Sequence, residues 1–128
     1  MDHTYYFDGN EKTISWVIKT DETNIEQKRT HAEYYYDQVS IEQSKYIALH
    51  VGIFWAIGRF VIKNGDTVKV MLDLNSMLEH LMKDKKNDDP FIESRTRFIK
   101  QLIEQRGLNI RYQLIEPKNN LATKLLIA

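Results

Sequence analysis

The residues through which this sequence could do chemistry are two aspartates, Asp8 and Asp73. Asp8 follows the run His-Thr-Tyr-Tyr-Phe, whose aromatic and β-branched side chains favour a strand. Asp73 follows the apolar run at 67–72 in the same way. Two carboxylates at the ends of neighbouring strands repel each other unless a proton or a cation lies between them, and oxygen ligands suit a hard ion such as Mg²⁺. The pair therefore predicts a metal site, with two separate turn caps as the simpler alternative.

Whether these aspartates meet depends on the elements before and between them. Alternating residues predict three antiparallel strands at 3–8, 13–20 and about 25–37. From Ile41 the apolar residues recur every three or four positions, which predicts a largely buried helix that runs to the Asn-Gly-Asp turn at 64–66. A helical crossover returns the chain in the same direction, so strands 3–8 and 67–72 can lie parallel, with both aspartates at one rim of the sheet.

The second half of the chain completes an α/β pattern. Helices are predicted at 76–83 and 90–106, the second with Asp89 as its N-cap and Pro90 at its first position. A strand at 109–115 and a short helix at 120–127 follow. We therefore expect one domain over residues 1–128, with a five-stranded mixed sheet. Three of its strands are antiparallel, two later ones run parallel to the first, and helices cover both faces.

The composition narrows the class of protein. The chain has 128 residues, 42% of them apolar, which suits one core. The 18 basic and 18 acidic residues balance, so no overall positive field attracts nucleic acid. The sequence has no cysteine, which excludes thiolate zinc sites and disulfides. Charged residues rather than a signal peptide follow the first methionine, and polar residues interrupt the apolar stretch at 46–62, so we expect a cytoplasmic protein with no membrane role.

The charges are unevenly distributed along the chain. Residues 81–128 hold ten basic and six acidic groups. A cluster of these cations could contact phosphates, although a solvated surface is the more common role of such a run: Lys83, Lys85, Lys86, Arg95, Arg97 and Lys100. The three tyrosines at 34–36 could stack on unpaired bases, but packing against the sheet is the simpler interpretation.

Four segments of the sequence resemble the type 1 ribonuclease H family. Tyr-Phe-Asp-Gly at 6–9 resembles the family's first strand and turn, and the run that ends at Asp73 resembles the strand that carries its third carboxylate. Ser-Lys-Tyr-Ile-Ala-Leu at 44–49 resembles the helix pattern Ala-Glu-Leu-x-Ala-Leu. Asn-Asn-Leu-Ala-Thr-Lys-Leu at 119–125 resembles the closing pattern Asn-x-x-Ala-Asp-x-Leu. The order of elements also resembles that of the family over nearly the whole chain.

The resemblance implies an enzyme that cleaves the RNA strand of RNA–DNA hybrids with two Mg²⁺ or Mn²⁺ ions held by four carboxylates. Asp8 and Asp73 match two of these catalytic, metal-binding positions, whereas Lys45 stands at the glutamate and Thr123 at the final aspartate. The resemblance also implies nucleic-acid contacts from Asn10, Gln43, Lys45 and Asn119. Because lysine in place of glutamate replaces a negative charge by a positive one, we expect hybrid cleavage to be reduced or lost.

Three arrangements of this site remain open. Glu42, one turn before Lys45, could face the site and bind metal. The Lys45 ammonium could replace one of the two ions, or it could bridge both aspartates in an inactive ion network. The candidate functions are therefore a nucleic-acid-associated protein with reduced or lost cleavage, an active Mg²⁺- or Mn²⁺-dependent ribonuclease H, and a non-catalytic protein-interaction module whose partner the sequence does not identify.

Overall fold

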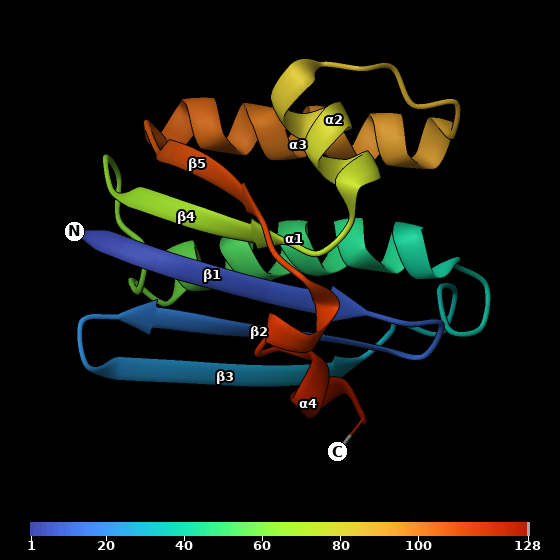
Figure 1. The fold of residues 1–128 in the computed structure, drawn as a ribbon, viewed down its shortest axis with the longest axis horizontal. Coiled ribbons are helices and arrows are strands. Elements are labelled where there is room, and N and C mark those ends of the chain that lie inside the picture. The colour runs from blue at the N-terminus through green and yellow to red at the C-terminus, as the bar shows by residue number, and fades with distance from the viewer. Residues whose placement is uncertain (128) are drawn as a thin grey trace.

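A computed structural model describes residues 1–127, which form a five-stranded sheet with helices on both faces (Figure 1). The strands are β1 (Asp2–Gly9), β2 (Thr13–Thr20), β3 (Thr23–Thr30), β4 (Thr67–Leu72) and β5 (Asn109–Leu114). The helices are α1 (Ile41–Gly58), α2 (Asn75–Lys83), α3 (Pro90–Arg106), the 3₁₀ turn η1 (Pro117–Asn119) and α4 (Thr123–Ile127).

The sheet has the strand order β3-β2-β1-β4-β5. The first three strands are antiparallel, and β4 runs parallel to both β1 and β5. The antiparallel neighbours are joined by short turns, whereas each parallel pair is joined through helices, as a crossover requires. The predicted mixed α/β sheet is therefore confirmed.

Helix α1 covers one face of the sheet, and α3 packs beside it. The Tyr5 hydroxyl of β1 donates to the Ala48 carbonyl of α1 over 2.6 Å, and Trp16 packs against Trp55 with ring centroids 5.8 Å apart. Gly52 permits this close approach, because a Cβ atom there would lie 1.8 Å from the Tyr5 hydroxyl oxygen. The long apolar stripe of the sequence thus forms the seam between helix and sheet.

Helix α4 covers the opposite face (Figure 1). The Ser15 hydroxyl of β2 donates to the Ala122 carbonyl, just before α4, over 2.8 Å. Because successive side chains of a strand point to opposite faces, Asp8 and its cross-strand partner Ser15 lie on the α4 face, whereas Phe7 and Trp16 lie on the α1 face. Within residues 1–127, no helix combines the length and the apolar character needed to cross a membrane.

The third strand is shorter than the sequence predicts. It ends at Thr30, and Tyr34, Tyr35 and Tyr36 lie in a turn instead of on a strand. The reason is the register of the sheet: Thr30 pairs with Thr13, the first residue of β2, so the chain beyond Thr30 has no strand left to pair with. The expected packing of these tyrosines on the sheet through alternate strand positions is therefore wrong.

Two helices also differ from the predicted boundaries. Helix α1 ends at Gly58 instead of continuing to Asn64, since Phe60 adopts a left-handed conformation with φ of 62°. The backbone N–H groups of Val61 and Ile62 then return to the Ala56 carbonyl, so Ile62 enters the core from a loop. At the other end of the chain, the predicted helix at 120–127 begins only at Thr123, after η1.

Candidate functional site

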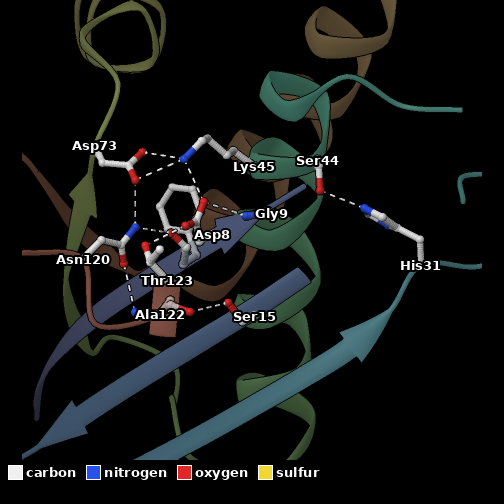
Figure 2. A network of polar contacts seen from close by, with 11 residues as sticks. Asp8, Gly9, Ser15, His31, Ser44, Lys45, Asp73, Asn120, Ala122 and Thr123 are labelled. Carbon is white, nitrogen blue, oxygen red and sulfur yellow. Dashed lines mark hydrogen bonds and ion pairs between the residues drawn. The ribbon is translucent and has the colours of Figure 1, made fainter. Parts of the chain in front are cut away.

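Asp8 and Asp73 meet at the rim formed by the carboxyl ends of β1 and β4. The parallel register pairs Tyr6 with Met71, and each aspartate lies two residues beyond that pair. The strand geometry therefore brings the two carboxylates together, at the kind of edge where open α/β sheets place their ligands. Both side chains are buried. Figure 2 shows them on either side of the same ammonium group.

That ammonium group belongs to Lys45, in the second turn of α1. Its Nζ atom donates to Asp8 Oδ1 over 2.8 Å and to Asp73 Oδ1 and Oδ2 over 2.9 and 3.1 Å. The three side chains are each less than a tenth exposed, at 9% for Lys45, 7% for Asp8 and 6% for Asp73. We call these three residues the Lys45 cluster. It is a buried ion triad, and its charges are screened little by solvent.

The opposite charges within the Lys45 cluster largely cancel one another. Burial by itself lowers the pKa of Lys45, but the hydrogen bonds and charges of Asp8 and Asp73 outweigh it, so the pKa lies above its ordinary value. The lysine is therefore firmly charged at neutral pH. Two carboxylates and one ammonium leave a formal charge of −1, and neutral donors must stabilise it.

Those neutral donors are the backbone N–H next to Asp8 and two side chains from the C-terminal part of the chain (Figure 2). The backbone N–H of Gly9 donates to Asp8 Oδ1 over 2.8 Å. The Thr123 hydroxyl donates to Asp8 Oδ2 over 2.7 Å, and the Asn120 amide donates to Asp73 Oδ2 over 2.9 Å. Each carboxylate oxygen of the Lys45 cluster thus has at least one donor. Such a fully paired network satisfies its buried charges without a further cation.

Asn120 is a residue of this site that the sequence pattern did not single out. Its Nδ2 atom donates both to the Phe7 carbonyl and to Asp73, and its Oδ1 atom accepts from the backbone N–H of Ala122. Asn120 is 4% exposed, whereas Asn119, the residue suggested by the closing pattern, is exposed in η1. Asparagine commonly accepts a backbone N–H at the start of a helical turn, and its place three residues before α4 could have pointed to Asn120.

The end of β1 lies very close to α1, and this contact positions Lys45. A Cβ atom on Gly9 would lie 2.3 Å from Ser44 Oγ, so only glycine allows this approach. The Ser44 hydroxyl in turn lies 2.8 Å from His31 Nε2, which anchors the helix to the segment that follows β3. Burial lowers the pKa of His31, so this imidazole is neutral at pH 7. Neither Ser44 nor His31 was singled out from the sequence for this role.

Glu42 lies away from the aspartates. Its carboxylate accepts long hydrogen bonds of 3.4 Å from the Ser76 hydroxyl and 3.5 Å from the Asn87 amide. It therefore faces α2 and the loop after it, and Lys45 alone extends from this part of α1 between Asp8 and Asp73.

Asn10 and Gln43 are both engaged in local structure. Asn10 Oδ1 accepts from the backbone N–H groups of Lys12 and Thr13 and so holds the β1–β2 turn. Gln43 forms a capping box with Ser40 at the start of α1, and its amide donates to Asp89 Oδ2 over 2.8 Å. The structure thus places both residues near the rim, with their amide groups used to fix the turn and the helix.

The donor set does not fit a pair of divalent ions. Mg²⁺ requires oxygen ligands at about 2.0–2.1 Å in octahedral geometry, and an ammonium group offers no lone pair. The Lys45 nitrogen already lies at hydrogen-bond distance from both carboxylates, where an ion would have to be. Among residues 1–127, no group of three or more histidine, aspartate or glutamate side chains is arranged to hold a metal. A metal would have to displace Lys45 first.

Comparison with known proteins identifies the fold. No protein-family model and no curated protein matches this sequence. Among solved structures, RNase H1 from the halophilic archaeon Halobacterium salinarum superposes with a TM-score of 0.80 at 16% identity, covering 98% of this chain and 94% of that one. LC11-RNase H1, isolated from compost by a metagenomic approach, gives 0.82 at 18% identity and covers 98% and 93%.

A third match is the N-terminal RNase H domain of a Mycobacterium tuberculosis protein, with a TM-score of 0.80, 17% identity and coverage of 98% and 91%. The same LC11 enzyme in complex with an RNA/DNA hybrid matches with a TM-score of 0.71 at 14% identity, again covering 98% and 93%. The sheet order and these matches together define the class of fold. This chain has the ribonuclease H fold over nearly its entire length.

Proposed function

We propose that this chain is a nucleic-acid-associated protein of the ribonuclease H fold in which cleavage of RNA–DNA hybrids is lost or strongly reduced. One observation carries the proposal: the ammonium of Lys45 bridges Asp8 and Asp73 at 2.8 and 2.9 Å. Lys45, which stands at the family's glutamate position, thus points into the site and brings a positive charge to it. Of the three arrangements open from the sequence, this geometry supports the inactive ion network.

The electrostatics support the same conclusion. The raised pKa of Lys45 keeps the ammonium charged, so a divalent ion would compete with a resident cation. Displacing Lys45 would also leave its charge without a partner beside α1, and breaking one side of a buried ion pair costs about 3–5 kcal/mol. Thr123 contributes a neutral hydroxyl where the family pattern has a carboxylate, so the site lacks the negative charge that would offset that cost.

Association with nucleic acid is proposed on the fold and on the basic C-terminal third of the chain. The hybrid complex of LC11-RNase H1 has the same fold as this chain. Binding through lysine and arginine contacts to phosphates releases counterions, so the affinity should fall steeply with salt. Because no metal is needed for such contacts, EDTA should leave the affinity unchanged.

A cleavage assay tests the loss of activity. Purified protein and an Asp8→Asn variant are incubated with a labelled RNA–DNA hybrid in Mg²⁺ and, separately, in Mn²⁺. We expect the same background hydrolysis from both proteins in both metals. Metal-dependent cleavage by the wild type that Asp8→Asn abolishes would establish the active alternative instead.

A charge-restoring variant makes this test sharper. In Lys45→Glu combined with Thr123→Asp, four carboxylates would face one another at the rim. A ligand that binds only the folded state raises the melting temperature, so Mn²⁺ should stabilise this variant and leave the wild type unchanged. An equal Mn²⁺ effect on the wild type would contradict the proposal, because Asp8 and Asp73 would then bind metal despite Lys45.

A protein-interaction module is the second candidate, and one observation favours it. Phe54 on α1 and Phe98 on α3 are 62% and 53% exposed. Aromatic side chains are enriched at protein–protein interfaces. Fluorescence anisotropy with a labelled hybrid and a labelled single strand at low salt separates the two candidates. Binding that weakens with salt supports nucleic-acid association. If neither the hybrid nor the single strand binds, the protein-interaction module is the supported candidate.

A further inference from the structure

We propose that a cavity between α2 and α3 binds a phosphate group that carries several free oxygens. The loop 84–89 leads from the end of α2 to the start of α3 along one side of the molecule (Figure 1). Beneath it lies a cavity of about 240 Å³, which we call the α2–α3 cavity. One water occupies roughly 30 Å³ in the liquid, so the cavity has room for a tetrahedral oxyanion.

The α2–α3 cavity is lined by an excess of positive charge. Four basic residues line it against two acidic ones, Asp84 and Glu93, which gives a formal charge of +2 (4 − 2) with histidine counted as neutral. The basic residues are Lys85, Lys86, Arg97 and Lys100. Clustered cations around a concave surface raise the local concentration of anions.

Three of these four cations have no partner of their own. Lys100 donates to Asp84 over 2.6 Å, and this bond lowers the pKa of Asp84. The side chains of Lys85, Lys86 and Arg97, by contrast, make neither a hydrogen bond nor an ion pair within residues 1–127. Their charges are therefore available to a ligand, whereas most of the charge of Asp84 is already compensated.

A buried hydroxyl lines the same cavity and also lacks a partner. Thr96 is 4% exposed, and its Oγ1 atom has no hydrogen-bond partner within the described residues. Buried polar atoms almost always have a partner, and an exception calls for an explanation such as an absent ligand or water. The Oγ1 atom itself has almost no exposed surface, so a phosphate oxygen in the α2–α3 cavity would accept from this hydroxyl once the neighbouring side chains move slightly apart.

The remaining acidic group of the lining, Glu93, already accepts hydrogen bonds from neighbouring donors. Glu93 Oε1 accepts from His80 Nε2 over 3.0 Å and from the backbone N–H of Asn87 over 2.8 Å. The Asn87 bond is the main reason that the pKa of Glu93 lies below its ordinary value. His80 Nδ1 lies 2.8 Å from the buried Tyr46 hydroxyl, so the imidazole is held between the core and Glu93. The carboxylate thus opposes an anion less than its formal charge suggests.

These observations favour a terminal or free phosphate over a phosphodiester. Several unpaired cations and a buried hydroxyl gather around one concavity, which offers donors to three or four oxygens of one phosphorus centre. A phosphodiester has only two unesterified oxygens, and the chain on both sides of it must continue along the protein surface. The shared ligand chemistry is a phosphate dianion, either free or at the end of a nucleotide or nucleic-acid strand. The cavity is separate from the Lys45 cluster, so this proposal does not rest on the loss of catalysis.

Calorimetric titration with inorganic phosphate, at ionic strength held constant with chloride, tests the site on the whole chain. Thr96→Val keeps the shape of the side chain and removes the hydroxyl, and Arg97→Gln removes one unpaired cation. Since a hydrogen bond to a charged group is worth about tenfold in affinity, each variant should weaken phosphate binding about tenfold. Lys19→Gln, which removes a cation from the distant strand β2, is the matched control and should bind as the wild type does.

The two possible sources of the phosphate are distinguished with a single-stranded oligonucleotide that carries either a 5′-phosphate or a 5′-hydroxyl. Tighter binding of the phosphorylated strand, lost in Arg97→Gln, assigns the cavity to strand ends. Equal binding of both strands together with saturable inorganic phosphate binding assigns it to free phosphate or nucleotides. The proposal is overturned if inorganic phosphate shows no saturable binding, or if Thr96→Val and Arg97→Gln bind it as well as Lys19→Gln does.

Discussion

The Thr123 hydroxyl donates a 2.7 Å hydrogen bond to Oδ2 of Asp8, although 115 positions separate the two residues in sequence. The same carboxylate accepts from Lys45 through its other oxygen, Oδ1. The two residues that depart from the family pattern therefore converge on one aspartate. A neutral donor on one oxygen and a cation on the other stabilise the charge of Asp8 from within the protein. Lys45 and Thr123 act together, since each supplies a hydrogen-bond donor to one oxygen of Asp8.

Removal of the Lys45 ammonium should strongly destabilise the fold. Lys45→Met keeps an unbranched apolar side chain out to Cε but removes the ammonium, which leaves two buried carboxylates facing each other without a cation. Loss of one partner from a buried ion network costs about 3–5 kcal/mol, and urea unfolding at pH 7 measures it. Lys12→Met is the control, because Lys12 pairs with Asp37 at the surface and solvent screens that pair.

Acidification should narrow the difference between Lys45→Met and the wild type. Protonation of the carboxylates removes their mutual repulsion in the variant and their attraction to Lys45 in the wild type. The two unfolding free energies should therefore approach each other as acid is added. A gap that stays constant with pH would show that lost packing, not lost charge, destabilises the variant.

Asn120 should be far more important for stability than its neighbour. Asn120→Ala removes two donated bonds, to Phe7 and Asp73, and one accepted bond that begins the turn into α4. Because the groups left without a hydrogen bond are buried, we expect a loss of about 2–3 kcal/mol in the free energy of unfolding. Asn119→Ala changes an exposed side chain one position earlier, and we expect less than about 0.5 kcal/mol. Equal effects would contradict the role assigned to Asn120.

The order of helices and strands could be predicted from the sequence for two reasons. Each segment keeps one hydrophobic period along its length, and the connections between segments allow few topologies. The change of period at Ile41 predicted a crossover helix, and such a crossover allowed β1 and β4 to lie parallel side by side, as they do in the structure. The end of β3 could not be read in this way. Residues 31–37 carry strand-forming side chains, but whether they pair depends on where the partner strand begins.

The composition of the site was visible in the sequence, but its geometry was not. Glu42 and Lys45 lie one turn apart on α1, and helical periodicity alone allows either to face the aspartates. The choice depends on the rotation of α1, which the contact between Gly9 and Ser44 sets. That contact joins residues far apart in the sequence, and no local pattern encodes it. The same holds for the pairing of Asn120 with Asp73.

The contact between Gly9 and Ser44 gives a fourth prediction. A Cβ atom at Gly9 would meet the Ser44 side chain at 2.3 Å and its backbone at 2.8 Å, so Gly9→Ala forces α1 away from the sheet rim. Overpacking of this kind costs about 1–3 kcal/mol in the free energy of unfolding. Gly58→Ala is the matched control, since a Cβ atom there meets nothing within 4 Å. Alanine at that helical position should instead stabilise the protein by about 0.5–1 kcal/mol, which urea unfolding would detect.

His50 should make the stability of the protein depend on pH below neutrality. Its Nδ1 atom accepts from the Arg95 guanidinium over 3.1 Å, which only an imidazole unprotonated at that nitrogen can do. Burial, and to a lesser extent the Arg95 charge, lowers the pKa of His50 to about 4. An unfolded histidine titrates near 6.5, so between these two values the unfolded chain binds a proton that the folded chain does not.

The sign of the effect follows from that difference in bound protons. Stability contributed by neutral His50 is fully present above about pH 6.5 and is lost as the pH falls toward about 4. His50→Gln keeps an acceptor for Arg95 but cannot be protonated, so its unfolding free energy should decline less between pH 6.5 and 4.5 than that of the wild type. Titration of the His50 ring by NMR checks the cause directly. A ring that titrates near its ordinary pKa would show that the bond from Arg95 does not persist in solution, and the two proteins would then lose stability in parallel.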